Sequence, residues 1–316
     1  METITTAYGD LPVTGQVERF ADGQARAVFP AGPAHLATPA GELCPQYTID
    51  DSRRQDLIPL LFHPNGRIRS MSLEQRSLVT TPIGPLPAEL VTFHPNGALA
   101  RVFPLNGKLS GYWSEEDEAR LAEPLTVPLA QGPLTARFVS VAFDTAGRLR
   151  SLTLWPGEEV TIASPLGPLP TRLGISFHPD GSLRSLEPAK PVAVPTPVGP
   201  IRAFDPDAIG VCGDSNSLVF SPDGAVTAVA TVRTSVTATL PDGQRRTLAP
   251  SLRECLCGGE EKEVAALRLT FRADRIEVTT APGRPPTVLP TTGTTFTTSP
   301  YLAAFAIPLA PKRCAG

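Results

Sequence analysis

The chain has 316 residues, a formal net charge of -3, and 28 Lys and Arg residues that are scattered rather than clustered. This charge pattern disfavours nucleic acid and anionic membranes as partners. With 36 prolines and 26 glycines, the composition is typical of many short strands rather than of a helical protein.

The N-terminal segment has no basic region followed by an apolar stretch, and no run reaches the roughly 18 apolar residues that a membrane span needs. We therefore expect a cytoplasmic protein with no membrane partner. The 5 cysteines make an odd number in a chain without a secretion signal. A disulfide framework is therefore not expected.

A tight-turn signal recurs along the chain, most clearly as Phe-His-Pro-Asn-Gly. Pro presets the backbone for a turn, Asn or Asp bonds to its own backbone, and Gly accepts the positive φ that closes a hairpin. The copies are Phe20–Gly23, Phe62–Gly66, Phe93–Gly97, Phe143–Gly147, Phe177–Gly181 and Phe220–Gly224.

A second turn signal, typically Thr-Pro-x-Gly, follows each first one. The glycines of the two signals lie 18 to 20 residues apart in five units and 35 apart in the third. The third unit therefore carries an insertion of about 17 residues between Asn106 and Pro124. The second signals end at Gly41, Gly84, Gly132, Gly167, Gly199 and Gly243.

The segments between the turns alternate apolar and polar residues, so each unit is predicted to be two strands. Six units predict an all-β protein, an antiparallel meander of about twelve or more strands with one short helical insertion. The spacing of Leu149, Leu152 and Leu154 breaks strict alternation, which predicts a bulge at Arg150 and Ser151. An open sheet, a sandwich and a barrel all satisfy this pattern.

The hairpin unit resembles the MORN-type and YwqK-like bacterial β-hairpin repeat families. The likeness rests on Asn65-Gly66, Asn96-Gly97, Asn106-Gly107 and the segment Gly111-Tyr112-Trp113. Such families are mostly scaffolds or binding surfaces, so the resemblance implies interaction rather than chemistry. We expect the repeats over residues 18–248, an edge segment at 1–17, and a cap hairpin and tail at 249–316.

The insertion is the first candidate site. Ser114 followed by acidic residues predicts the N-cap of a short helix. As a docking element, Tyr112 and Trp113 would offer a stacking surface beside Glu115 and Lys108. Alternatively, the helix covers an edge of the sheet with its aromatic rings packed inward.

Three further groups carry chemistry-bearing residues. His63, His94 and His178 occupy equivalent turn positions, but copies two strands apart, roughly 10 Å, are too far apart to share an ion. Cys212, Cys255 and Cys257, with Cys44, are weak candidates for a zinc site, and we expect no metal and no cofactor. The connector 204–216 is rich in oxygen ligands, and it offers Asp205, Asp207, Asp214 and Asn216 for a cation or for acid–base work.

Two functions fit these patterns. The first is a non-enzymatic β-repeat scaffold that presents its sheet, and the insertion, to a protein partner. The alternative is a small-ligand-binding protein or enzyme whose pocket is formed by residues 106–124 and 204–216. Its site would use Lys108, Tyr112, Trp113, Glu115, Asp205 and Asp214.

Overall fold

The computed structural model describes residues 2–49, 52–54, 58–208, 213–254, 262–281 and 283–302. The described chain is nearly all β and forms two compact units, residues 1–155 and 156–316. The predicted all-β antiparallel meander is confirmed. Its main sheet has 17 strands, which pair mainly with their neighbours in chain order. The three-part division at residues 17 and 248 stays a prediction.

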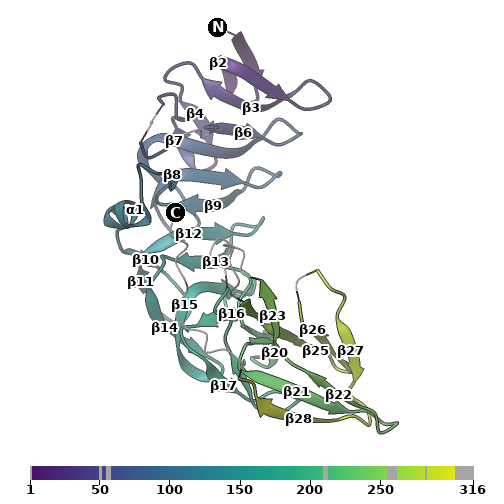
Figure 1. Cartoon of the computed structure of the whole chain (residues 1–316). Coiled ribbons are helices and arrows are strands. Elements are labelled where there is room, and N and C mark those ends of the chain that lie inside the picture. Colours follow the sequence, from purple (N-terminus) through teal and green to yellow (C-terminus); the bar gives the residue numbers. More distant parts are fainter. Residues whose placement is uncertain are drawn as a thin grey trace. The chain divides into compact units, whose positions relative to one another are not determined.

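In the first unit, nine meander strands follow one another as antiparallel neighbours (Figure 1). They are β1 (Glu2–Thr6), β2 (Gly9–Arg19), β3 (Ala25–Pro30), β6 (Leu60–Phe62), β7 (Ile68–Val79), β8 (Leu86–Phe93), β9 (Leu99–Phe103), β12 (Phe138–Phe143) and β13 (Leu149–Leu154). Two short hairpins stand apart from them, β4 (Leu36–Thr38) with β5 (Gly41–Leu43) and β10 (Leu125–Val127) with β11 (Leu134–Ala136).

The second unit continues the same pattern with eight meander strands. They are β14 (Glu159–Ser164), β15 (Gly167–Phe177), β16 (Leu183–Pro188), β19 (Leu218–Phe220), β20 (Val226–Thr231), β25 (Leu267–Phe271), β26 (Arg275–Thr279) and β27 (Thr287–Pro290). Smaller sheets join β17 (Val192–Val194) with β18 (Ile201–Ala203), β21 (Thr234–Thr239) with β22 (Arg245–Leu248) and β28 (Thr295–Pro300), and β23 (Ser251–Glu254) with β24 (Lys262–Ala265). The expected final hairpin is β25 with β26.

The first turn signal closes every main hairpin in the same way. At Phe93–Gly97, for example, the His94 N–H donates to the Ala98 carbonyl and the Gly97 N–H to the His94 carbonyl. Gly97 has a φ of 91°, which only glycine adopts without strain. The predicted turns therefore form as hairpin ends.

The predicted bulge is confirmed, and all six hairpins have it. Ala142 pairs with Ser151 while Phe143 pairs with Leu149, so Arg150 is left unpaired. The same one-residue shift follows the turn in every other first-signal hairpin. Each bulge lets two apolar residues three apart in sequence lie on the same face of the sheet.

On that face, a continuous row of core side chains runs through seven strands of the first unit, β3 to β13, and another runs through six strands of the second, β15 to β26. Every member is almost fully buried, which stabilises the fold by roughly 1.5–3 kcal/mol per side chain. In the first unit, successive partners are Val28, Leu60, Met71, Val91, Val102, Val141 and Leu152. In the second unit, they are Ile175, Leu186, Leu218, Val229, Leu269 and Val278.

The second turn signal closes six hairpins, here called arms. The first five alternate between short and long, and the sixth, β21–β22, lies in a separate sheet with β28. Long arms are continuous with the meander (β7–β8, β14–β15), whereas short arms are separate hairpins (β4–β5, β10–β11, β17–β18). The hairpin β1–β2 is a further long arm, because Thr6-Ala-Tyr-Gly9 closes with the Thr6 Oγ1 donating to the Gly9 carbonyl, as Thr38 does to Gly41. Its sequence Gly9-Asp-Leu-Pro12 matches Gly84-Pro-Leu-Pro87.

Candidate functional site

The insertion forms one ordered helix, α1 (Glu115–Leu121), as its sequence predicts. Ser114 is the N-cap and makes a reciprocal capping box with Asp117, which satisfies the first free N–H groups of the helix. In Figure 1, α1 lies at the side of the first unit away from the tips of its main hairpins. One side chain of the helix, Glu118, is buried.

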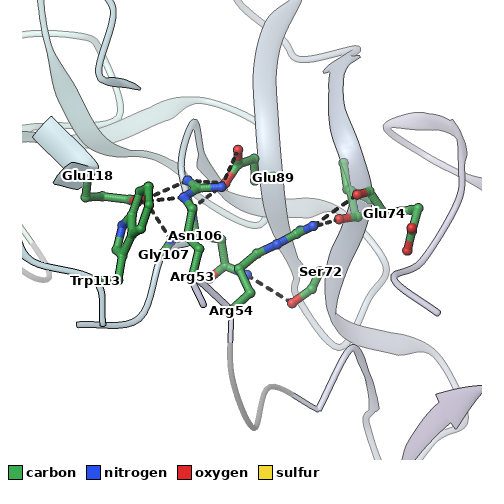
Figure 2. A network of polar contacts seen from close by, with 10 residues as sticks. Arg53, Arg54, Ser72, Glu74, Glu89, Asn106, Gly107, Trp113 and Glu118 are labelled. Atoms are coloured by element: carbon green, nitrogen blue, oxygen red, sulfur yellow. Dashed lines mark hydrogen bonds and ion pairs between the residues drawn. The ribbon is translucent and has the colours of Figure 1, made fainter. Parts of the chain in front are cut away.

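Glu118 belongs to a buried ionic cluster drawn from three segments (Figure 2). The Arg53 guanidinium donates through Nε to Glu118 Oε2 at 2.7 Å and through both terminal nitrogens to Glu89 at 3.0 and 2.8 Å. Arg53 comes from the segment before β6, Glu89 from β8 and Glu118 from α1. The planar guanidinium therefore fixes the insertion to the sheet through two carboxylates.

The remaining lone pairs of these carboxylates are also used. Glu118 accepts hydrogen bonds from the Trp113 Nε1 at 2.7 Å and from the Gly107 N–H at 2.8 Å. Glu89 accepts the Asn106 N–H at 2.8 Å. A Cβ at Gly107 would overlap the Glu118 carboxylate, so glycine permits this close approach.

These hydrogen bonds and ion pairs determine the pKa shifts of the cluster. Burial by itself would raise the pKa of Glu118, but hydrogen bonds from Arg53, Trp113 and Gly107 outweigh it and hold the pKa below its usual range. Burial also opposes the charge on Arg53, yet its two carboxylate partners leave its pKa raised. The cluster is a structural lock whose carboxylates accept hydrogen bonds from the chain itself.

A second set of contacts holds the segment that carries Arg53. The Arg54 guanidinium donates to the carbonyls of Leu73 and Glu74 at 2.7 and 3.0 Å (Figure 2). The Glu74 carboxylate accepts the N–H groups of Tyr47 and Thr48. The connector between β5 and β6 is therefore bound to β7 at both of its ends.

The outer surface of the insertion is apolar in places. Tyr112 is 81% exposed, Leu109 58% and Leu121 39%. Lys108 and Glu115 are exposed as well, and Trp113 is half-buried. The sequence left open whether the two aromatic rings are exposed or packed inward. The Trp113 indole packs inward, against Arg53 and Glu118, whereas the Tyr112 ring is exposed.

The second predicted connector, 204–216, is described at residues 204–208 and 213–216, and these residues are also held by buried polar contacts within the second unit. The Glu187 carboxylate accepts the N–H groups of Asp205 at 3.1 Å and Ser217 at 2.7 Å. Burial raises the pKa of Glu187 to about 7. Asp205 is buried and forms an ion pair with Arg268 at 2.6 Å, and Asn216 donates to Ser185.

The other members of this connector have separate surroundings. Asp207 forms an ion pair with Arg253 at 2.9 Å, and burial raises the pKa of Asp207. Asp214 is half-buried. Lys108, Tyr112, Trp113 and Glu115 belong to the first unit, whereas Asp205 and Asp214 belong to the second.

The three histidines each connect one hairpin to the next. Each imidazole Nε2 donates to the carbonyl of the phenylalanine that begins the next hairpin turn. His63 bonds Phe93 at 2.9 Å. His94 bonds Phe143 and His178 bonds Phe220, both at 3.0 Å.

Cys212, Cys255 and Cys257 lie outside the described residues. Cys44 is a half-buried free thiol. Within the residues that the structure describes, no group of three or more His, Cys, Asp or Glu side chains has the arrangement of a metal site.

Sequence reasoning missed the connector that supplies Arg53. The signal was present, because 25 residues separate Gly41 from Gly66, as they do Gly199 from Gly224. The three other second-to-first distances, which begin at Gly84, Gly132 and Gly167, are 13, 15 and 14 residues. The spacing predicts two long connectors, of which only 204–216 was recognised from its composition.

Comparison with known proteins finds no matching family model, no matching curated protein and no matching solved structure. The resemblance to MORN-type and YwqK-like repeats therefore stays a prediction. Over the part of the chain that the structure describes, no helix has the length and apolar character required to cross a membrane.

Proposed function

We propose that this chain is a non-enzymatic β-repeat scaffold of the cytoplasm that binds a protein partner, and neither nucleic acid nor membrane, through the insertion. The observation that supports this most strongly is the contrast between the inner side of the insertion, which is fixed to the sheet, and its exposed outer side. A buried lock of Arg53, Glu89 and Glu118 fixes the insertion, while Tyr112 and Leu109 point outward. We call the exposed side chains Leu109, Tyr112 and Leu121 the insertion platform.

Such a platform suits protein recognition for a physical reason. An exposed aromatic ring on an already ordered segment loses little conformational entropy when a partner covers it. The carboxylates of Glu115 and Glu116 lie exposed in the first turn of α1, next to Tyr112 in sequence. The partner surface should therefore combine an apolar pocket with basic side chains.

The scaffold interpretation is also favoured over the enzyme alternative by the connectors. Of the carboxylates that sequence analysis assigned to a pocket, Asp205 forms an ion pair with Arg268, whereas Glu115 is exposed. Two further buried carboxylates, Glu118 and Glu187, accept hydrogen bonds from Arg53 and from backbone N–H groups of their own unit. They hold the connectors in place.

Photo-crosslinking tests the proposal. A benzophenone amino acid at Tyr112 should capture a discrete partner in cells of the source organism. Leu166, an exposed position of a turn in the second unit, serves as the control site. Capture at residue 112 that is absent at residue 166 supports the proposal, and identical products at both sites count against it.

A further inference from the structure

The first strand of the chain has a free edge. Within the described residues β1 pairs with β2 alone. In that pairing Thr3 lies opposite Pro12, and the Pro12 carbonyl accepts a hydrogen bond from Ala31 on the far side of β2. Opposed residues of an antiparallel pair turn their polar groups either toward each other or both away.

The backbone N–H and C=O groups of Thr3 are therefore directed away from β2. Thr5, two residues on, has the same orientation because the strand period is two. The backbone N–H and C=O groups of the alternate residues Ile4 and Thr6 are directed toward β2, and the Ile4 side chain is buried. The outer edge of β1 is thus a short row of backbone donors and acceptors available for another strand.

A groove of about 490 Å³ runs along this edge. Five consecutive residues, 3–7, line one wall, as expected of a groove beside a strand edge rather than over a sheet face. The opposite wall comes from the tips of two main hairpins, with Gln24 from the first and Phe62 and Asn65 from the second. The five-residue wall is about 16 Å long at the usual strand rise.

The edge strand at the other end of the sheet, in the second unit, differs from β1 in its proline content. Its last strand, β27, ends at Pro290 and follows Pro285 and Pro286. Prolines on an edge strand remove backbone donors and block strand addition. The β1 sequence Glu2-Thr-Ile-Thr-Thr6 contains no proline, so this edge is left competent to pair.

We infer that the β1 groove binds an extended peptide of a partner protein by strand addition. The backbone of the peptide pairs with Thr3 and Thr5. One row of its side chains faces the Phe62 and Gln24 wall, and polar residues face solvent. Arg19 lines the groove with its guanidinium paired to Glu2 and hydrogen-bonded to the Gly23 carbonyl, so the peptide is recognised chiefly through its backbone.

The test uses the purified full-length chain and a phage-displayed library of random hexapeptides. Enriched hexapeptides are synthesised, and their dissociation constants are measured by fluorescence anisotropy. Thr3→Pro removes one outward N–H without removing a β1–β2 hydrogen bond, and Thr3→Val keeps that N–H. Gln24→Trp obstructs the groove from the opposite wall, so the test does not depend on one variant that fails to fold.

Hexapeptides that bind the wild type and Thr3→Val equally, but bind Thr3→Pro and Gln24→Trp at least about tenfold more weakly, support the inference. Equal binding to all four proteins, or no enrichment, overturns it. A dimer in sedimentation that Thr3→Pro abolishes would identify a second copy as the occupant and also overturn it. The groove shares no residue with the insertion platform. A negative peptide-binding result would therefore not affect the crosslinking test at Tyr112.

Discussion

The imidazole of His94 spans two neighbouring hairpins, because its Nε2 lies 3.0 Å from the backbone carbonyl oxygen of Phe143. The hairpin tips are further joined by Asn96, whose Nδ2 donates to the Thr145 carbonyl at 3.1 Å. His63 and Asn65 make the equivalent bonds one hairpin earlier. These clasps explain why His-Pro-Asn recurs: the motif makes a turn and attaches it to the next.

We expect His94→Ala to lower the free energy of unfolding by about 1–2 kcal/mol, because the Phe143 carbonyl loses its side-chain donor. His35→Ala is the matched control, since His35 is exposed and only approaches Glu42 at 3.6 Å. Its effect should stay within about 0.5 kcal/mol. Urea unfolding of the two variants measures the difference, and equal values would disprove the clasp.

Loss of the Arg53 side chain should be far more costly. Arg53→Ala leaves Glu89 and Glu118 buried without a cation, which destabilises by about 3–5 kcal/mol in comparable pairs. Arg120→Ala removes an exposed partner of Asp117 and should be nearly neutral. Limited proteolysis should cut Arg53→Ala first within the insertion, and an uncut insertion would contradict the lock.

Glu187 predicts a pH dependence. Its pKa is raised by burial from 4.5 to about 7, so the native state holds this proton more tightly than the unfolded state. The stabilisation is complete below about pH 4.5 and is lost as the pH rises through 7, with a span of roughly 3 kcal/mol. The wild type should therefore lose stability relative to Glu187→Gln between pH 5 and 8, and parallel profiles would refute this.

Gly174 marks the contact between β15 and the connector 204–216. A Cβ there would overlap Asn216 Oδ1 and lie 2.9 Å from the Gly213 backbone. We expect Gly174→Ala to cost about 1–3 kcal/mol through displacement of the connector. Gly111→Ala is the control, because no atom lies within 4 Å of its Cβ position. Thermal unfolding compares the two, and a neutral Gly174→Ala would contradict this packing.

The meander was predictable because its turn chemistry is local. Phe-His-Pro-Asn-Gly and Thr-Pro-x-Gly specify hairpin ends within a few residues, and the broken alternation at Leu149 located the bulge. Ser114 likewise specified the helix start. The arm β1–β2 was missed although Gly9-Asp-Leu-Pro12 repeats the arm pattern, because Thr6-Ala-Tyr-Gly9 lacks the proline found in five of the six second turn signals.

The buried lock was not predictable from local pattern. Arg53 and Glu118 are 65 residues apart, and nothing adjacent to either residue marks the pairing. The contact of each histidine to the next hairpin was not predictable either, because it depends on the distance between two turns. Polar pairs between residues far apart in the sequence depend on how the strands and connectors are placed in the folded protein. A single sequence does not reveal this placement.

The most direct test of the central claim is the affinity between this chain and the partner captured at Tyr112, measured by calorimetry. The Leu109→Ser, Tyr112→Ser double variant should keep the wild-type melting temperature, because both side chains are exposed, and should bind at least about tenfold more weakly. Leu166→Ser should bind as the wild type does. Equal affinity of the double variant and the wild type would contradict the insertion platform as the binding surface.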